Sequence, residues 1–217
     1  MTTEDTTLET KSKQLTETIV KGDSENAARL AEQIGKKGSQ ANEVVDTISD
    51  AMNIVADLHE VQRYSLEQVE SSERAANKAL EVIRPRIRVK QQRISGRVMV
   101  TSLQGDPHNF DKTLLMTMLE IGGFSALDGG ADLSADDIAT KVSRAKPDIL
   151  AVPLVSSAAV DSLVKAKSLL DGQGLKTKIV AYGRGVTGLP ETGIFTAVEE
   201  DSLGALSKIA EILLESS

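Results

Sequence analysis

Residues 97–120 read RVMVTSLQGDPHNFDKTLLMTMLE, and they place a short polar loop between an apolar strand and a helix. The run over 97–103 has strand length, and the apolar spacing of 113–120 is typical of a helix. Asp106 and the proline after it are suited to begin that helix. The loop also contains His108, one of two histidines in the chain. By itself this pattern fits a capped helix with an exposed histidine as well as a ligand site.

Strands and helices are expected to alternate from here to the end of the chain. The expected strands are 98–103, 125–127, 149–153, 178–182 and 193–197, and the expected helices are 109–121, 135–145, 159–170 and 202–215. This alternation predicts a doubly wound, flavodoxin-like, five-stranded parallel sheet with strand order 2-1-3-4-5. In that order the loops after the first and third strands border one crevice, so we expect His108, Ser156 and Ser157 to face it.

The first part of the chain has a different period. Between residues 7 and 84 the apolar side chains recur every three or four positions, which predicts four amphipathic helices packed as a bundle. The basic segment 84–93 follows, and Pro85 within it is expected to end the fourth helix. We therefore predict a helical cap domain over 1–90 and a flavodoxin-like domain over 91–217, joined by a solvated connector.

Composition excludes several classes of function. The formal net charge is −7, which argues against general nucleic-acid binding, and the chain has no cysteine for a disulfide or thiolate metal site. No apolar run is long enough to cross a membrane, and the first residues lack the features of a secretory signal. A cytoplasmic protein is expected, with neither nucleic acid nor membrane as a partner.

A helical bundle followed by a flavodoxin-like domain with Gly-Asp-x-His in its first loop resembles the cobalamin-binding module. That module occurs in methionine synthase and in the small corrinoid proteins of methyltransferase systems. The resemblance extends to Gly22-Asp23 and to the end of the bundle at residues 81–85. It implies that His108 is the lower ligand of the cobalt of a cobalamin or another cobamide, with Asp106 bonded to the other ring nitrogen. Such a carboxylate fixes the imidazole tautomer and raises its basicity.

The chain departs from the family pattern at four positions near the expected site. Asp111 occupies the position of the glycine in the motif D-x-H-x-x-G, and Pro153 that of a serine. Tyr182 and Arg184 stand where the family places small residues against the nucleotide tail. The resemblance assigns these residues to cofactor binding: Gly105, Asp106, His108, Asp111, Ser156, Ser157, Tyr182, Gly183, Arg184 and Thr187. Several also have ordinary structural interpretations: Ser156, Ser157 and Thr187 as loop or cap residues, Asp111 as an acid in a first helical turn, and Arg184 as the partner of acids such as Glu191.

The function implied by the resemblance is that of a methyl carrier. Such a protein shuttles a methyl group between a substrate-specific methyltransferase and a second, acceptor methyltransferase, and it has no complete catalytic centre of its own. The four departures support an alternative, in which a diverged relative acts as a sensor or protein-interaction module with altered or lost cofactor binding. A phosphorylated receiver domain is disfavoured, because Pro153 stands at the end of the third strand where that class carries an aspartate.

Overall fold

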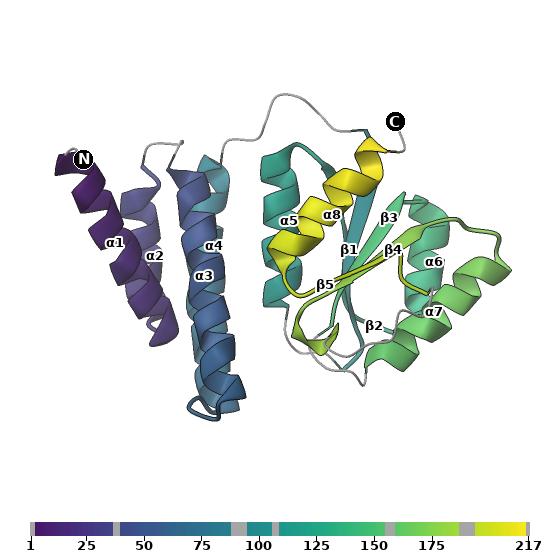
Figure 1. Ribbon diagram of the computed structural model, residues 1–217, viewed down its shortest axis with the longest axis horizontal. Coiled ribbons are helices and arrows are strands. Elements are labelled where there is room, and N and C mark those ends of the chain that lie inside the picture. The colour runs from purple at the N-terminus through teal and green to yellow at the C-terminus, as the bar shows by residue number, and fades with distance from the viewer. Residues whose placement is uncertain are drawn as a thin grey trace. The chain divides into compact units, whose positions relative to one another are not determined.

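The computed structural model describes residues 3–36, 40–87, 95–105, 109–154, 159–186 and 194–215, with side chains from residue 7 onward. The chain divides into two compact units, Met1–Arg88 and Val89–Ser217. Figure 1 shows the four helices of the first unit and the sheet of the second. No helix in the described ranges is long and apolar enough to cross a membrane.

The first unit is a bundle of four helices, as the apolar spacing predicts. The helices are α1 Thr3–Val20, α2 Ser24–Ile34, α3 Ala41–Glu60 and α4 Leu66–Ile83, and the short 3-10 turn η1 Arg84–Arg86 follows at Pro85. Small side chains are buried on α2 and α4, which pack against each other. The fully buried alanines of these two helices are Ala27, Ala31, Ala75, Ala76 and Ala79. Alanine at these positions lets helix axes approach closely while keeping the backbone helical.

The turn between α1 and α2 depends on a glycine. Gly22 has φ of +74°, and a Cβ built on it would lie 2.7 Å from the Cβ of Ser71 on α4. Both the positive φ and this close approach exclude larger residues. Asp23 then caps α2 by accepting a hydrogen bond from the Asn26 backbone N–H at 3.2 Å, and its bonds to the Asn26 side chain and backbone lower the pKa of the Asp23 carboxyl.

The second unit is a five-stranded parallel sheet with helices on both faces. The strands are β1 Arg97–Leu103, β2 Ser125–Leu133, β3 Ile149–Pro153, β4 Lys178–Tyr182 and β5 Ala197–Glu199. The helices are α5 Phe110–Gly122, α6 Ala135–Ala145, α7 Val160–Gly172 and α8 Ser202–Leu214. The strand order is β2-β1-β3-β4-β5, which confirms the predicted flavodoxin-like topology.

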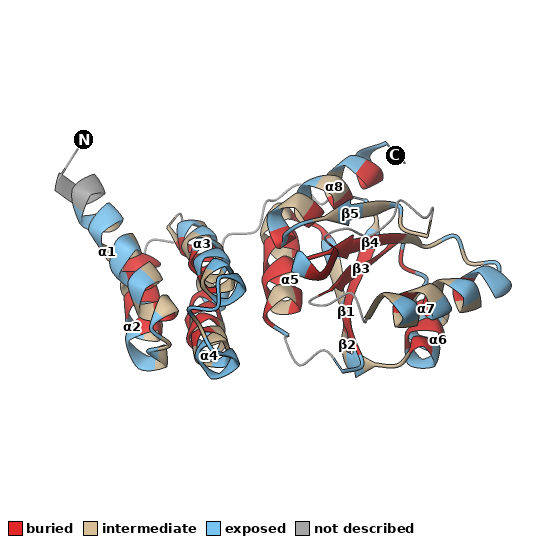
Figure 2. Ribbon diagram, turned by 60° about the horizontal axis from the view of Figure 1, so that its bottom comes forward, coloured by how far each residue is buried: buried red, intermediate tan, exposed pale blue. Residues whose placement is uncertain are grey.

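Alternate residues of the central strands point to opposite faces, so the sheet has two cores. Met99 and Leu150 pack with α6 and α7, whereas Val98 and Tyr182 pack with α5 and α8. Figure 2 shows the central strands buried along most of their length and the outer faces of the covering helices exposed. This two-sided burial explains why the central strands read as nearly continuous apolar runs.

Two strands differ from the sequence expectation. The fifth strand lies at Ala197–Glu199, later than the predicted 193–197, because residues 194–196 lead into the sheet without pairing as strand. The second strand is longer than predicted and extends to Leu133. Its register against β1 shifts between Val100 and Thr101 and again between Thr101 and Leu103. At each shift β2 carries one residue more than β1, and such bulges redirect the side chains beside them.

Candidate functional site

The candidate site lies at the carboxyl edge of the sheet, where β1 stands between β2 and β3. The strand order reverses here: β2 is added on one side of β1, and β3 on the other. The helix after β1 (α5) therefore covers one face of the sheet, and the helix after β3 (α7) covers the other. Ligands of doubly wound sheets bind at this switch point. Asp106 and His108 belong to the loop after β1, between the described residues Gly105 and Asn109, and they lie outside the described residues. Ser156, Ser157 and Thr187 also lie outside them.

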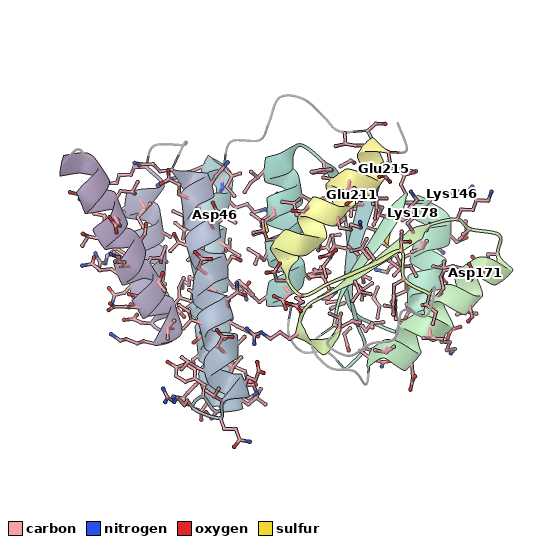
Figure 3. The ribbon with its side chains drawn as sticks, in the orientation of Figure 1. Asp46, Lys146, Asp171, Lys178, Glu211 and Glu215 are labelled. Atoms are coloured by element: carbon pink, nitrogen blue, oxygen red, sulfur yellow. The ribbon has the colours of Figure 1, made fainter. Side chains whose placement is uncertain are left out.

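The opposite, amino edge of the sheet is closed by structural contacts. The Asp148 carboxylate accepts a hydrogen bond from the Arg97 backbone N–H at 2.7 Å, and the Lys178 N–H donates to the Asp148 carbonyl at 3.0 Å. Figure 3 shows Lys146 and Lys178 at this edge. The polar groups of the amino edge therefore join strands and hold the turns before them.

Both ends of the loop after β1 are tied to the sheet by hydrogen bonds. The Ser102 hydroxyl, which is fully buried, donates to Asn109 Oδ1 at 2.9 Å and accepts from the Asp132 backbone N–H at 3.3 Å. Asp132 Oδ1 in turn accepts from the Gly105 backbone N–H at 2.9 Å. The residues on either side of Asp106-Pro107-His108 are thus fixed by β1 and by the bulged end of β2.

Tyr182 occupies the space between the end of β4 and the first turn of α5. Its side chain is fully buried, and its hydroxyl donates to the Asp111 backbone carbonyl at 3.1 Å. Asp111 itself stands in the first turn of α5, where a carboxylate interacts favourably with the helix dipole. The phenol and its hydrogen bond connect the edge of β4 to the helix that follows the His108 loop.

The turn after β4 is held against the end of β3 by its backbone. Leu154 N–H donates to the Tyr182 carbonyl and Gly185 N–H to the Leu154 carbonyl, each at 2.7 Å. Gly183 has φ of +99°, and a Cβ there would lie 3.0 Å from the Leu154 carbonyl oxygen. Glycine is needed here for this close backbone packing. Arg184 begins the short 3-10 turn η3 Arg184–Val186 and is exposed.

An ion pair between a nearly buried lysine and an exposed aspartate joins α5 to β2. Lys112 Nζ lies 2.7 Å from Asp128 Oδ1, with side-chain exposures of 10% and 56%. Partial burial raises the pKa of Asp128, but the hydrogen bonds from Lys112 and from the Gly130 N–H and the charge of Lys141 outweigh it, so that the pKa is lowered overall. This pair fixes the first turn of α5 to the strand that carries Asp132.

One buried hydroxyl at the carboxyl edge lacks a partner. Ser202 Oγ, in the first turn of α8, has no hydrogen-bond partner among the described residues, and the residue is 3% exposed. Burying a hydroxyl without a hydrogen bond is costly, so a ligand atom at this edge would stabilise it. The described ranges contain no group of three or more histidine or acidic side chains that could hold a metal ion.

The turn between α3 and α4 combines internal hydrogen bonds with exposed apolar side chains. The Tyr64 and Ser72 hydroxyls both donate to the Val20 carbonyl, at 2.9 and 3.0 Å. His59 Nδ1 lies 2.9 Å from the Tyr64 carbonyl oxygen. Nearby in sequence, Val61 and Leu66 are 63% and 54% exposed. The Tyr64 hydroxyl holds this turn to α1, and the exposed Val61 and Leu66 lie among exposed polar residues such as Gln62 and Arg63.

Fold and site together define a flavodoxin-like α/β unit with a histidine loop at its switch point, preceded by a helical domain. Comparisons with known proteins agree with this class. The profile of the B12 binding domain matches residues 12–84, which is the helical bundle. The chain is 25% identical over 201 residues to trimethylamine corrinoid protein 1 of Methanosarcina acetivorans, covering 88% of this chain and 92% of that relative.

Solved structures show the same fold. The monomethylamine corrinoid protein of Methanosarcina barkeri aligns with a TM-score of 0.78 at 22% identity, covering 92% of this chain and 96% of that one. The methanol:cobalamin methyltransferase complex of the same organism aligns with a TM-score of 0.50 at 19% identity, covering 94% and 79%. The chain is thus similar to corrinoid proteins over most of its length, and its helical bundle matches the B12 binding domain.

Sequence reasoning missed four polar residues that shape the site: Ser102, Asn109, Asp132 and Ser202. A signal for three of them was present. Ser102 ends an apolar strand, Asn109 directly follows His108, and Asp132 follows the strand that the predicted order places beside the first one. Ser202 gave no signal, because a serine at the start of a helix is an ordinary cap.

Proposed function

We propose that this chain is a methyl carrier that binds a cobamide, with His108 as the lower ligand of cobalt and Asp106 as the group that orients its imidazole. The observation that supports this proposal most strongly is the strand order. It puts Gly105 and Asn109, the described residues on either side of 106–108, at the switch point of a doubly wound sheet. The match to the B12 binding domain and the similarity to a corrinoid protein support the same cofactor.

The residues of the chain fit such a group in three respects. The imidazole of His108 would supply one protein ligand, which suits a metal whose other ligands belong to a macrocycle. The carboxylate two residues before it can accept the proton of the second ring nitrogen, so the ligating nitrogen keeps its lone pair. The unpartnered Ser202 hydroxyl, at the same edge of the sheet, can donate to a polar atom of the cofactor. When bound, the cobalt supplies a nucleophilic centre for methyl transfer.

The helical unit has the complementary role in this proposal. Its turn between α3 and α4 presents Val61 and Leu66 to solvent. Exposed apolar side chains of this kind suit contact with the apolar face of a flat macrocycle. We propose that this turn covers the reactive face of the cofactor and withdraws when a partner approaches. The partners in the proposal are a substrate-specific methyltransferase and an acceptor methyltransferase, and methylated amines are the first donors to test, since the relatives are named for them.

The test uses cobinamide, the corrinoid without a nucleotide base, so that no nitrogen of the cofactor can ligate cobalt from below. The protein is loaded with cobinamide, desalted, and reduced to the paramagnetic cobalt(II) state. Electron paramagnetic resonance should show nitrogen splitting from the protein, and labelling the protein with nitrogen-15 should change that splitting. The His108→Ala variant should lose it.

The other histidine of the chain provides the matched control. His59→Ala removes an imidazole from the helical unit and should leave the nitrogen splitting unchanged. If His108→Ala keeps the splitting, or if the wild-type protein shows none, His108 is not the cobalt ligand and the proposed function in this form is wrong.

One observation favours the second candidate, a diverged relative with altered or lost cofactor binding. Tyr182 fills the space beside the first turn of α5 and has its hydroxyl satisfied by Asp111. A nucleotide tail cannot enter that space unless the phenol moves. Retention of cobinamide together with loss of full-length cobalamin after desalting would indicate altered binding. Loss of both would favour the sensor or interaction module.

A further inference from the structure

The amino edge of the sheet carries a group of exposed cations that is separate from the candidate site. Arg97 begins β1, Lys146 stands between α6 and β3, and Lys176 lies just before β4. Because β1, β3 and β4 are neighbours in the sheet, these three residues occupy adjacent positions along one edge. Arg144, in the last turn of α6, adds a fourth cation. We call these four residues the amino-edge patch, and Figure 3 shows Lys146 within it.

Most cations of the sheet unit have partners, whereas most of the amino-edge patch has none. The lysines that form ion pairs with carboxylates are Lys112, Lys165, Lys167 and Lys208. Lys141 Nζ donates to the Gly129 carbonyl at 2.7 Å. Within the described ranges, the side chains of Arg144, Lys146 and Lys176 form no ion pair or hydrogen bond. Arg97 uses one guanidinium nitrogen to donate to the Lys146 carbonyl at 2.9 Å.

The acidic groups at this edge do not neutralise the amino-edge patch. The Asp148 carboxylate accepts the backbone N–H of Arg97 at 2.7 Å and is the acid beside these cations in the described chain. Glu211 and Glu215 lie toward the end of α8, where Figure 3 labels both. Since α8 covers the opposite face of the sheet from α6 and α7, these acids stand on the other side of the edge. The side next to α6 and α7 keeps an excess of positive charge.

The helix dipole accounts for only part of the amino-edge patch. A cation near the end of a helix is stabilised by the dipole, which explains Arg144 and Lys146 after α6. Arg97 and Lys176 precede strands, and a sheet has only a small net dipole. Lys146 also has φ of +46°, in the left-handed region that glycine or asparagine adopts with less strain. The turn therefore does not require a lysine there.

The arrangement of the four cations fits an extended acidic surface better than a small anion. A small anion is bound by donors that converge on one point, whereas these cations start from neighbouring strands about 4.8 Å apart. The formal net charge of −7 argues against nucleic acid, whose phosphates would be repelled by the rest of the protein. Aspartate and glutamate side chains on a protein can match the spacing of the patch. Exposed charges of this kind speed association and leave the complex easy to dissociate.

We propose that the amino-edge patch is a docking surface for the acidic face of a partner protein. The candidate cofactor site lies at the carboxyl edge, and roughly 20 Å of strand separates the two edges. A partner held at the amino edge therefore leaves the carboxyl edge accessible. Such an arrangement suits a protein that presents one site to more than one enzyme. The inference concerns this surface alone and does not depend on which residue ligates cobalt.

The test uses a short peptide of glutamate residues as the probe and the full-length, nitrogen-15-labelled protein. At low ionic strength, the peptide should shift the amide signals of the amino-edge patch, and the shifts should weaken at about 0.15 M salt. A triple variant with Arg144→Gln, Lys146→Asn and Lys176→Gln removes three exposed charges. It should bind the peptide about tenfold more weakly, the scale of three exposed ion pairs. Asparagine at position 146 keeps a residue that tolerates the left-handed backbone.

A second triple variant controls for net charge. Lys165→Gln, Lys167→Gln and Lys208→Gln remove the same number of positive charges, but from side chains that already pair with carboxylates. Peptide affinity in this variant should stay within about twofold of wild type. Circular dichroism checks that both variants are folded. Retention of cobinamide should be unchanged in both, so that a failure of the docking inference leaves the proposed function standing.

Three results would overturn the inference. Equal weakening in the two triple variants would mean that the peptide responds to net charge and not to the amino-edge patch. If inorganic phosphate at the same concentration shifts the same amides as strongly as the peptide, the patch is a small-anion site. If vesicles containing phosphatidylserine bind the protein through these residues and the peptide does not, the patch faces a membrane.

Discussion

The two units of the chain use their polar side chains for different purposes. In the helical unit, Tyr64 and Ser72 both bond to the Val20 carbonyl and thereby close the bundle, while apolar side chains remain at the surface. In the sheet unit, Ser102 bonds to Asn109 and Asp132 to Gly105, the two described residues that flank positions 106–108. The difference teaches that these polar bonds close the bundle upon itself in one unit, whereas in the other they join two strands to the start of a helix.

The largest expected effect tests how strongly the sheet unit depends on the phenol beside its site. Tyr182→Ala removes a fully buried aromatic ring and should lower the free energy of unfolding of the sheet unit by about 3 to 5 kcal/mol. Tyr182→Phe keeps the ring and loses only the bond to Asp111, so it should cost about 1 kcal/mol. Denaturant unfolding followed by circular dichroism measures both.

Two further variants test what the ring excludes. If Tyr182 blocks the nucleotide tail, Tyr182→Gly should strengthen retention of a cobamide with its full benzimidazole base and leave cobinamide retention unchanged. Arg184→Ala tests the other possibility, a contact of the exposed guanidinium with the nucleotide phosphate, and should weaken retention of the full cobamide. No change in either variant would show that the tail does not pass this turn.

The second effect concerns the close helix packing of the bundle. Gly22→Ala should destabilise the helical unit by about 2 kcal/mol or more, since the new Cβ adds a clash with Ser71 to the strain of a positive φ. Gly174→Ala is the matched control, with φ of +69° and open space around the new Cβ, and should cost about 1 kcal/mol. Hydrogen exchange assigns each loss to its unit. Equal losses would mean that backbone strain alone accounts for Gly22.

A smaller effect is expected in the pH dependence of the sheet unit. The lowered pKa of Asp128 means that its ion pair with Lys112 stabilises the folded state above the ordinary aspartate value of 3.8. That contribution is lost as the pH falls through the lower, folded-state pKa. Lys112→Met should flatten this part of the stability profile, by well under 2 kcal/mol because water screens the half-exposed carboxylate. If Lys112→Met leaves the fall in stability at low pH unchanged, the Lys112–Asp128 pair does not contribute to it.

The smallest expected effect is a pH dependence of stability in the helical unit, with the opposite sign to that of Asp128. Loss of hydration raises the pKa of Asp46, and the negative charge of Asp50 one turn away adds to the shift. A raised folded-state pKa stabilises the fold below the ordinary aspartate value, and this advantage is lost as the pH rises through the folded-state pKa. Asp46→Asn should therefore gain slightly in thermal stability at neutral pH relative to wild type and lose that gain in acid. A gain that persists unchanged in acid would contradict the assignment.

Most of the fold could be predicted because both parts of the sequence have a clear apolar pattern: a helical spacing in the first, and strands alternating with helices in the second. Helices α3 and α6 and strands β3 and β4 follow from apolar spacing, and the strand order follows from right-handed crossovers. The fifth strand was misplaced because it is three residues long and at the sheet edge, where burial leaves little pattern. The longer β2 was missed because its bulged end contains two glycines and two aspartates, residues that usually indicate a turn.

The candidate site could be predicted less completely. The loop with His108 could be singled out, because a histidine after a buried strand is uncommon and the expected strand order borders that loop with a crevice. The bonds of Ser102 and Asp132 to Asn109 and Gly105 could not be predicted, because the bulges of β2 change the register by single residues. The role of Tyr182 was also open, since the sequence shows its size but cannot show that its hydroxyl reaches the Asp111 carbonyl.

The two tyrosines that close these units also give the chain a built-in optical readout. The protein has two tyrosines and no tryptophan, and each unit contains one of them. Tyr64 donates its phenolic proton to the Val20 carbonyl and Tyr182 to that of Asp111, so each fluorophore reports the closure of its own unit. With Tyr64→Phe or Tyr182→Phe one emitter is silenced, and the emission that remains follows a single unit during unfolding or partner binding, without any attached dye.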